Sequence, residues 1–204
     1  MKEKIDFVIT WVDGNDPMWL KEKKEYEIIP NKDEMFELWN NNTIRYRDWD
    51  LLKYWFRGVE ENASWVNKIY FITYGHLPSW LNTENEKLKI VNHKEFIPQE
   101  YLPTFNSNTI ELNLHRIKEL SDKFVYFNDD MYLLRETKET DFFKKGLPVE
   151  NVGVDCVALD WNVGHAEINN IQLINKHFEK KQVLKKYWRK WFNPINGKQF
   201  MKTI

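Results

Sequence analysis

Apolar runs that suit β-strands alternate, along the first two-thirds of the chain, with segments whose apolar positions repeat at helical spacing. This alternation indicates an α/β fold, in which helices cover a mainly parallel sheet. The strand-like runs lie at residues 5–11, 68–74, 88–91 and 124–127. The run at 124–127 carries no charge, so we expect a strand buried on both faces of the sheet.

Two helices are predicted to pack on this sheet. The first follows Asp48, a candidate N-cap, and the second runs from about Asn108 to Leu120 with Asn106 or Ser107 as its cap. A third, charge-rich segment at 18–31 is typical of a surface helix. The apolar faces are Leu52, Trp55, Phe56 and Val59 in the first helix, and Ile110, Leu114 and Ile117 in the second.

Oxygen-bearing side chains follow the strand at 124–127, where Asn128, Asp129 and Asp130 come in succession. Ligands of open α/β sheets bind outside the carboxyl ends of the strands. Adjacent carboxylates there suit a hard cation, Mg2+ or Mn2+, which also binds phosphate. A plain turn is the alternative, because Asn and Asp favour turns through local hydrogen bonds.

The first strand also ends in a polar loop, which begins Trp11-Val12-Asp13-Gly14. A strand that leads directly into an acidic, glycine-containing loop is how many nucleotide-binding α/β domains begin. Gly14 would allow the backbone to approach a ligand closely. An ordinary turn explains the same residues equally well.

Further candidates precede or lie on the two helices. Arg45 and Arg47 stand shortly before the first helix, where an anionic ligand would also meet free backbone N–H groups. Glu111 and His115 are four residues apart and would share a helical face beside Arg116. A Glu that accepts a hydrogen bond from a His fixes its tautomer and raises its basicity. Surface salt bridges and a purely structural histidine are the alternatives.

Composition excludes several classes of protein. The 204 residues suit one domain, or one domain with an appendage, and a net charge of -1 argues against nucleic acid as the main partner. A single cysteine, Cys156, allows no internal disulfide and no cysteine-based zinc site. With no signal-like or membrane-spanning apolar run, we expect a cytoplasmic protein. The basic, aromatic stretch 180–191 leaves open a peripheral contact with the inner face of the plasma membrane or with another subunit. A solvated helix face is the simpler interpretation.

Taken together, several stretches resemble the Stealth family, whose members include bacterial capsular polysaccharide phosphotransferases and the animal N-acetylglucosamine-1-phosphotransferase. The match covers roughly residues 4 to 134 and keeps the family's order. Residues 5–17 resemble conserved region 1. Conserved region 2 is matched by Arg45-Tyr46-Arg47-Asp48, residues 65–70, Leu102-Pro103-Thr104-Phe105-Asn106-Ser107, Leu114-His115-Arg116-Ile117 and Phe127-Asn128-Asp129-Asp130-Met131.

The resemblance implies a Rossmann-like, GT-A-like core that binds a nucleotide-sugar. It implies transfer of a hexose-1-phosphate, typically N-acetylglucosamine-1-phosphate from the UDP-sugar, to a hydroxyl of a glycan acceptor, with release of UMP, in capsular or cell-surface polysaccharide synthesis. On this hypothesis Asn128, Asp129 and Asp130 hold the cation. His115, Asp13 and Arg116 are the catalytic candidates, and the donor-binding candidates are Trp11, Gly14, Arg45, Arg47, Asn106, Ser107 and Glu111.

Family members normally carry two further conserved regions. We therefore expect residues 1–160 to form the core of regions 1 and 2, and residues 161–204 to form a helical extension that begins region 3. Two other functions stay open at this point. One is a metal-dependent glycosyltransferase on the same core, which would release UDP, and the other is a non-catalytic module that binds a nucleotide-sugar.

Overall fold

The structure is a computed structural model of the whole chain, and it describes residues 4–27, 46–149 and 162–191. The chain divides into two compact units, Met1–Pro148 and Val149–Ile204, each of which is described by itself. Arg45 lies outside the described residues, and so do residues 152–159, for which the sequence predicts a further strand.

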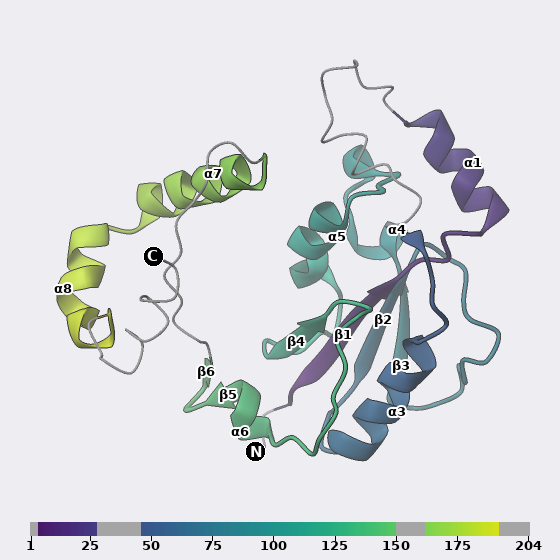
Figure 1. Cartoon of the computed structure of the whole chain (residues 1–204), viewed down its shortest axis with the longest axis horizontal. Coiled ribbons are helices and arrows are strands. Elements are labelled where there is room, and N and C mark those ends of the chain that lie inside the picture. The colour runs from purple at the N-terminus through teal and green to yellow at the C-terminus, as the bar shows by residue number, and fades with distance from the viewer. Residues whose placement is uncertain (1–3, 28–45, 150–161, 192–204) are drawn as a thin grey trace. The chain divides into compact units, whose positions relative to one another are not determined.

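A four-stranded parallel sheet forms the centre of the first unit (Figure 1), which confirms the predicted α/β class. The strand order is β3-β2-β1-β4, so β1 is an inner strand with β2 on one side and β4 on the other. In register, Phe7 of β1 pairs with Ile69 of β2 and with Val125 of β4. The strands are β1 (Asp6–Trp11), β2 (Ile69–Thr73), β3 (Leu88–Asn92) and β4 (Phe124–Phe127).

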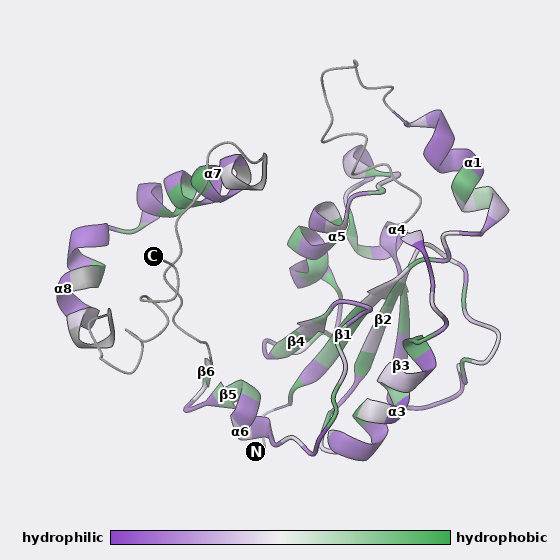
Figure 2. Cartoon of the chain, viewed as in Figure 1, coloured by the Kyte–Doolittle hydropathy of each residue, from purple (hydrophilic) through white to green (hydrophobic). Residues whose placement is uncertain are grey.

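Each face of the sheet buries its own apolar cluster, because successive side chains of a strand point to opposite faces. On one face Phe7 and Ile9 pack with Trp55 and Val59 of α3, and on the other Val8 packs with Leu114 and its neighbours. Figure 2 shows the apolar residues along the strands. The helices of this unit are α1 (Pro17–Glu25), α3 (Leu52–Asn62), α4 (His93–Phe96), α5 (Ser107–Asn113) and α6 (Glu139–Phe142).

Short elements complete the first unit. Two turns of 3-10 helix, η2 (Gln99–Tyr101) and η3 (Leu114–Arg116), lie on either side of α5. A small antiparallel pair, β5 (Phe143–Lys144) and β6 (Leu147–Pro148), follows α6.

Three predicted details of the fold are wrong. Helix α3 begins at Leu52, with Leu51 rather than Asp48 at its N-cap. Helix α5 ends at Asn113 instead of reaching Leu120, because the chain tightens there into η3. Strand β4 is the last strand of the order described, so only Phe127 of its four residues is fully buried.

A buried carboxylate ties together the amino-terminal edge of the sheet. Asp6, the first residue of β1, is fully buried, and its Oδ1 accepts hydrogen bonds from Asn67 Nδ2 at 2.6 Å and from the Lys68 backbone N–H at 3.1 Å. Its Oδ2 accepts from the Ser121 N–H at 2.8 Å. Buried charge is tolerated when several donors solvate it, so Asp6 holds the start of β1 to the segments that lead into β2 and β4.

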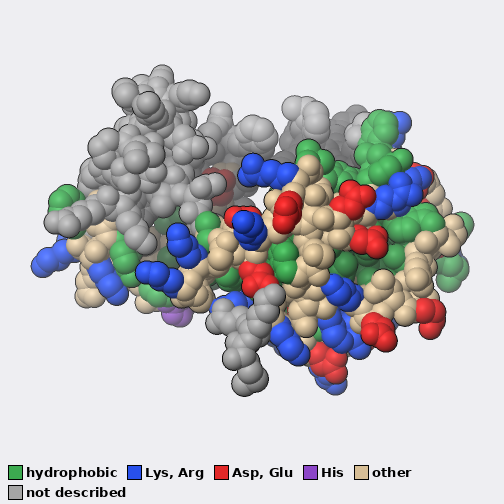
Figure 3. All heavy atoms as spheres, turned by 90° about the horizontal axis from the view of Figure 1, so that it is seen from below, with side chains coloured by type: hydrophobic (Ala, Val, Ile, Leu, Met, Phe, Trp, Pro, Cys, Tyr) green, Lys and Arg blue, Asp and Glu red, His purple; other side chains and the backbone are tan. Residues whose placement is uncertain are grey.

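The second unit contributes two described helices, α7 (Asn162–His177) and α8 (Lys180–Trp191), the latter with a kink at Tyr187. No helix in the described part of the chain is long and apolar enough to cross a membrane. On the face seen in Figure 3, acidic and basic side chains are interspersed over the centre and right of the described surface, whereas basic ones prevail at the left.

Candidate functional site

The candidate site lies where the strand order reverses direction. The chain adds β2 and then β3 on one side of β1, and then crosses to add β4 on the other side. Between β1 and β4 the loops that leave the carboxyl ends therefore diverge, and such a switch point is where open α/β sheets bind ligands. The loop after β1 carries Asp13, and the loop after β4 carries Asp129 and Asp130.

The loop after β4 forms a turn in which the Met131 N–H donates to the Asn128 carbonyl oxygen at 3.1 Å. Tyr132 Oη donates to the Asp129 carbonyl oxygen at 3.0 Å. The turn predicted by the simpler interpretation is thus present, and it carries two carboxylates close enough for their charges to interact. Asn128, Asp129 and Asp130 are exposed, as a ligand site requires.

Negative charge at this turn is not neutralised by any described lysine, arginine or histidine within ion-pair distance. Partial burial raises the pKa of Asp129, and the negative charges of Asp130 and then Asp48 raise it further. Although Asp129 is exposed as a whole residue, its carboxyl lies deep enough among neighbouring atoms to lose hydration. The site therefore holds clustered carboxylates that a cation would stabilise.

The residues fit a divalent cation by their chemistry. In the described ranges, no three His, Cys, Asp or Glu side chains converge in the way that a fully protein-bound metal requires. Mg2+, however, is usually held by one or two carboxylates together with water and substrate phosphates. Two adjacent aspartates without a described cationic partner match that smaller donor set.

Asp48 contacts the end of β1 and does not cap α3 as predicted. Its Oδ2 accepts a hydrogen bond from Trp11 Nε1 at 3.0 Å, which joins the segment before α3 to the end of β1. Arg47 stacks on Trp49, with its guanidinium carbon 3.9 Å from the ring centroid. Arg47 is exposed and precedes α3 by five residues, so it lies farther from that helix's N-terminus than predicted.

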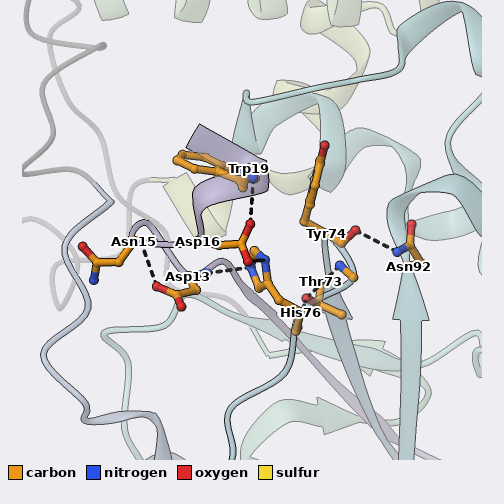
Figure 4. Close-up of polar contacts among 9 residues, drawn as sticks. Asp13, Asn15, Asp16, Trp19, Thr73, Tyr74, His76 and Asn92 are labelled. Atoms are coloured by element: carbon orange, nitrogen blue, oxygen red, sulfur yellow. Dashed lines mark hydrogen bonds and ion pairs between the residues drawn. The ribbon is translucent and has the colours of Figure 1, made fainter. Parts of the chain in front are cut away.

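The loop after β1 is held by its own polar side chains. Asp13 Oδ1 accepts from the Asn15 N–H at 2.9 Å, and Asp16 Oδ1 accepts from the Trp19 N–H at 2.7 Å as the N-cap of α1 (Figure 4). The Asp13 backbone N–H donates to Nε2 of His76 at 2.7 Å. The position of Asp13 thus depends on a histidine more than sixty residues away in the sequence.

Gly14 packs against protein rather than standing open to a ligand. A Cβ built on Gly14 would lie 2.0 Å from the Tyr46 carbonyl oxygen and 2.8 Å from its Cβ. The Tyr46 ring in turn lies 4.9 Å from the Trp19 ring, and its hydroxyl donates to the Phe105 carbonyl oxygen at 3.4 Å. Gly14 is therefore needed here so that two segments can cross closely.

Helix α5 begins at the same edge of the sheet. Asn106 is its N-cap, with its side chain accepting from the Asn108 N–H at 2.9 Å, and Ser107 is the first helical residue, exposed to solvent. One turn later, Glu111 Oε1 accepts from the Tyr126 hydroxyl at 3.3 Å, and that hydroxyl also lies 3.1 Å from Thr10 Oγ1. Burial raises the pKa of Tyr126 to about 12, so it stays a neutral donor.

His115 and Arg116 lie farther along the chain than Glu111, in η3, and both are exposed. Because α5 ends before His115, Glu111 and His115 do not share an α-helical face, and the hydrogen bond of Glu111 goes to Tyr126. After η3 the chain runs to Ser121, whose N–H donates to Asp6 at the amino-terminal edge of the sheet. The structure thus gathers Trp11, Asp13, Asn106, Glu111 and Asp129 near one edge, and the hydrogen bond of Glu111 goes to Tyr126 and not to His115.

His76 is the site residue that the sequence analysis missed. It closes the turn after β2, where Thr73 Oγ1 accepts from the Gly75 N–H at 3.3 Å and donates to the His76 carbonyl oxygen at 2.6 Å. Asn92 Nδ2 donates to the Tyr74 carbonyl oxygen at 2.8 Å and holds the same turn from β3. Only the parallel pairing of β2 with β1 brings this turn beside Asp13, and the sequence alone gives no local signal for it.

A cavity of ≈ 790 Å³ lies elsewhere, between α3 and the segment that joins β2 to β3. Its lining includes Phe56, Arg57, Trp80 and Asn82 but none of Asp13, Asp129 and Asp130. Its size suits a ligand, yet the clustered carboxylates and the switch point lie outside it. We therefore place the candidate chemistry at the switch point.

The fold and the site together define a Rossmann-like α/β domain with an acidic site at the switch point of a parallel sheet. Comparison with known families agrees with the sequence resemblance. Residues 3–29 match Stealth protein CR1, conserved region 1, and residues 45–150 match Stealth protein CR2, conserved region 2. The chain belongs to the Stealth protein family.

Curated relatives are similar over nearly the whole chain. The capsular polysaccharide phosphotransferase WcwK of Streptococcus pneumoniae is 48% identical over 97% of this chain and 59% of the relative. The receptor polysaccharide phosphotransferase WefC of Streptococcus oralis is 43% identical over 98% of this chain and 60% of its own length. The capsular polysaccharide phosphotransferase CpsJ of Streptococcus thermophilus is 44% identical, with 98% and 82% covered. The chain thus spans about three-fifths of the first two relatives.

Proposed function

We propose that this chain carries the donor-binding and phosphoryl-transfer site of a sugar-1-phosphate transferase that acts in capsular or cell-surface polysaccharide synthesis. The observation that carries the proposal is the pair Asp129 and Asp130 at the switch point, close to the carboxylate of Asp48, in a family whose named relatives are polysaccharide phosphotransferases. A clustered negative site without a described cationic partner suits a cation-bound pyrophosphate better than it suits a free anion.

In the proposed reaction, a hydroxyl oxygen of the glycan acceptor attacks the phosphorus next to the sugar of a UDP-sugar, such as UDP-N-acetylglucosamine. The new O–P bond forms as the bridging O–P bond breaks, UMP leaves with the electron pair, and the hydroxyl proton passes to a base. Such transfer depends mainly on positioning and on neutralising charge. A phosphodiester to the sugar is the product.

The chain's residues take the following roles in this proposal. Asn128, Asp129 and Asp130 hold Mg2+ or Mn2+, which when bound neutralises the charge of the donor pyrophosphate. Trp11 and Asp13 form the wall of the donor site, Gly14 keeps their loop packed on Tyr46, and Arg47, Arg45 or Arg116 clamps the phosphates. Ser107, Asn106 and Glu111 line the N-terminal end of α5 at the same edge. His115 is the proposed base, and its exposed ring leaves it free to meet an acceptor.

Identification of the nucleotide that is released tests the proposal directly. The protein is incubated with UDP-N-acetylglucosamine, Mg2+ and a glycan acceptor, and the products are separated and followed by phosphorus NMR. UMP together with a sugar phosphodiester supports phosphotransfer. Release of UDP would show a glycosyltransferase instead, and tight donor binding with neither product would show a binding module.

A matched pair of variants links the reaction to the turn after β4. Asp130→Asn removes a charge from the proposed cation site, whereas Asp122→Asn removes one from an exposed residue before the other end of the same strand. We expect Asp130→Asn to lower turnover by about 10³-fold or more, as loss of a main electrostatic group does, and Asp122→Asn to leave it unchanged. Near-normal turnover in Asp130→Asn would refute the cation role.

A further inference from the structure

His76 stands beside the loop that carries Asp13, and it comes from a different strand. It contacts that loop at two places (Figure 4): its Nε2 accepts from the Asp13 backbone N–H at 2.7 Å, and its Nδ1 lies 3.8 Å from Asp16 Oδ2. Its ring also packs at a right angle to the Trp11 ring, with centroids 5.3 Å apart and planes at 90°. One side chain thus touches the end of β1, the loop and the cap of α1.

The hydrogen bond to Asp13 fixes the tautomer of the imidazole. A backbone N–H can only donate, so Nε2 must present its lone pair, and the proton of the neutral ring must lie on Nδ1. That Nδ1–H points towards the side of Asp16, the carboxylate that caps α1. The neutral ring is therefore hydrogen-bonded to the loop through Nε2, with Nδ1 near the cap but beyond hydrogen-bond distance of it.

The turn that carries His76 is itself rigidly built. Thr73 is buried and bonds to the turn at both Gly75 and His76. Gly75 has φ +139°, a conformation that other residues rarely adopt, and its neighbour Tyr74 is held by Asn92. A rigid support on β2 allows His76 to act as a fixed point for a loop on β1.

We propose that His76 is a positioning residue, whose neutral imidazole holds the Asp13–Gly14 backbone in place to receive the nucleotide-sugar at the switch point. This inference rests on the proposed function for its choice of ligand, although the hydrogen bond itself does not. Removal of the acceptor leaves the part-buried Asp13 N–H without its partner and frees the loop to move. Donor binding then weakens while the chemical step, which uses other residues, is less affected.

Acid should break the hydrogen bond between the Asp13 N–H and His76 Nε2. A proton on Nε2 turns the acceptor into a donor that faces the Asp13 N–H, and the resulting cation pairs with Asp16 instead. The groups that face the ring are the carboxylates of Asp13 and Asp16, the Tyr74 ring at 6.0 Å, and His93 of α4. Burial lowers the pKa of His76, and the two carboxylates oppose that effect, so release occurs only below the ordinary titration range of histidine.

Two substitutions test separately the hydrogen-bond acceptor and the aromatic ring of His76. His76→Gln keeps an oxygen acceptor at a similar reach but cannot titrate, whereas His76→Phe keeps an aromatic edge towards Trp11 and has no acceptor. His177→Gln, at the exposed end of α7, is the matched control. We expect His76→Phe to raise KM for the UDP-sugar about tenfold, the effect of one lost buried hydrogen bond. His76→Gln should keep KM near that of the wild type at neutral pH. It should not show the rise in KM that we expect for the wild type at acid pH.

Nitrogen NMR of the wild-type protein with 15N-labelled histidine supplies a readout that does not need turnover. The neutral Nδ1–H tautomer at His76 and a large shift of the Asp13 amide signal in His76→Phe support the proposal. An Nε2–H tautomer, or an unchanged KM in His76→Phe, would overturn it. If the wild type shows no turnover at all, the proposed function fails, and the NMR result together with calorimetric donor binding still decides the role of His76. If His76→Phe does not fold, the tautomer and the pH profile of His76→Gln decide.

Discussion

Gly14 and Tyr46 cross with their backbones in direct contact, so that a Cβ on Gly14 would stand 2.0 Å from the Tyr46 carbonyl oxygen. This contact joins the two conserved regions of the family, because Gly14 lies in the first and Tyr46 in the second. The loop that carries Asp13 is therefore held at two adjacent residues, Gly14 by Tyr46 and Asp13 by His76.

Gly14→Ala should displace this loop. The new methyl group meets backbone, which cannot rotate away, so the strain should cost about 2 kcal/mol of stability and weaken donor binding as well. Thermal unfolding and calorimetric titration with the UDP-sugar measure the two effects. Asn15→Ala, one residue along and exposed, is the control that should change neither. A Gly14→Ala protein with the wild-type Tm and donor affinity would contradict this account.

Asp129→Asn should separate function from stability. Burial and the charges of Asp130 and Asp48 raise the pKa of Asp129, so its ionised form destabilises the metal-free folded state. This cost is absent below the ordinary pKa of aspartate and appears as the pH rises through the raised pKa. At pH 7, Asn removes this cost and should raise the Tm. The rise should be only about 2 °C, because solvent screens the charge of a partly exposed group.

The same Asp129→Asn variant should lose Mg2+-dependent donor binding. The Tm is measured in EDTA, and binding is measured by calorimetry with and without Mg2+. A lower Tm in the metal-free variant would show that the carboxylate stabilises the fold, which is the opposite of what clustered charge predicts.

His93 should make the protein sensitive to acid. It is buried at the start of α4, and burial, followed by the nearby His76, lowers its pKa to about 4. The unfolded chain takes up a proton near pH 6.5 and the folded chain does not, so stability is full above pH 6.5 and falls as the pH drops towards 4. The loss reaches about 3 kcal/mol for this one group.

Denaturant unfolding at pH values from 7 to 4 measures this slope. His93→Phe has no proton to bind and should show a shallower fall, whereas His177→Gln should follow the wild type. Equal slopes in His93→Phe and the wild type would show that other groups cause the acid sensitivity.

Asp6→Asn should destabilise the protein without changing the site. The carboxylate accepts three hydrogen bonds, and an amide would turn one of its oxygens into a donor that faces a backbone or side-chain N–H. The expected loss is about 3 kcal/mol. Urea unfolding gives this value, and donor binding measured well below the unfolding midpoint should equal that of the wild type. Asp122→Asn, which is exposed near the same edge, is the control.

Much of the fold was predictable because its signals are local. The apolar runs mark all four strands of the sheet to within about two residues, and the buried face of α3 follows from helical spacing. The predicted end of α5 failed because Leu114 and Ile117 are buried from a 3-10 turn and the residues after it, which mimic helical spacing. Asp48 looked like an N-cap, but its carboxylate binds Trp11, a partner that no local pattern reveals.

The candidate site was predictable only in part for the same reason. The acidic residues after β1 and β4 stand out in the sequence, and the parallel topology brings their loops to one edge. The partner of Glu111, however, is Tyr126 rather than His115, and His76 reaches Asp13 from another strand. Such pairings depend on register and strand order, which residue spacing does not encode.

The two ends of the sheet hold their carboxylates under opposite conditions. Asp6 is sealed and fully hydrogen-bonded at one end, whereas Asp129 is crowded and under-neutralised at the other. The sheet is thus stabilised at its amino-terminal edge, and the candidate site lies at its carboxyl-terminal edge. Substitutions in the loops at that edge can therefore change the site while the hydrogen bonds of Asp6 keep the fold in place.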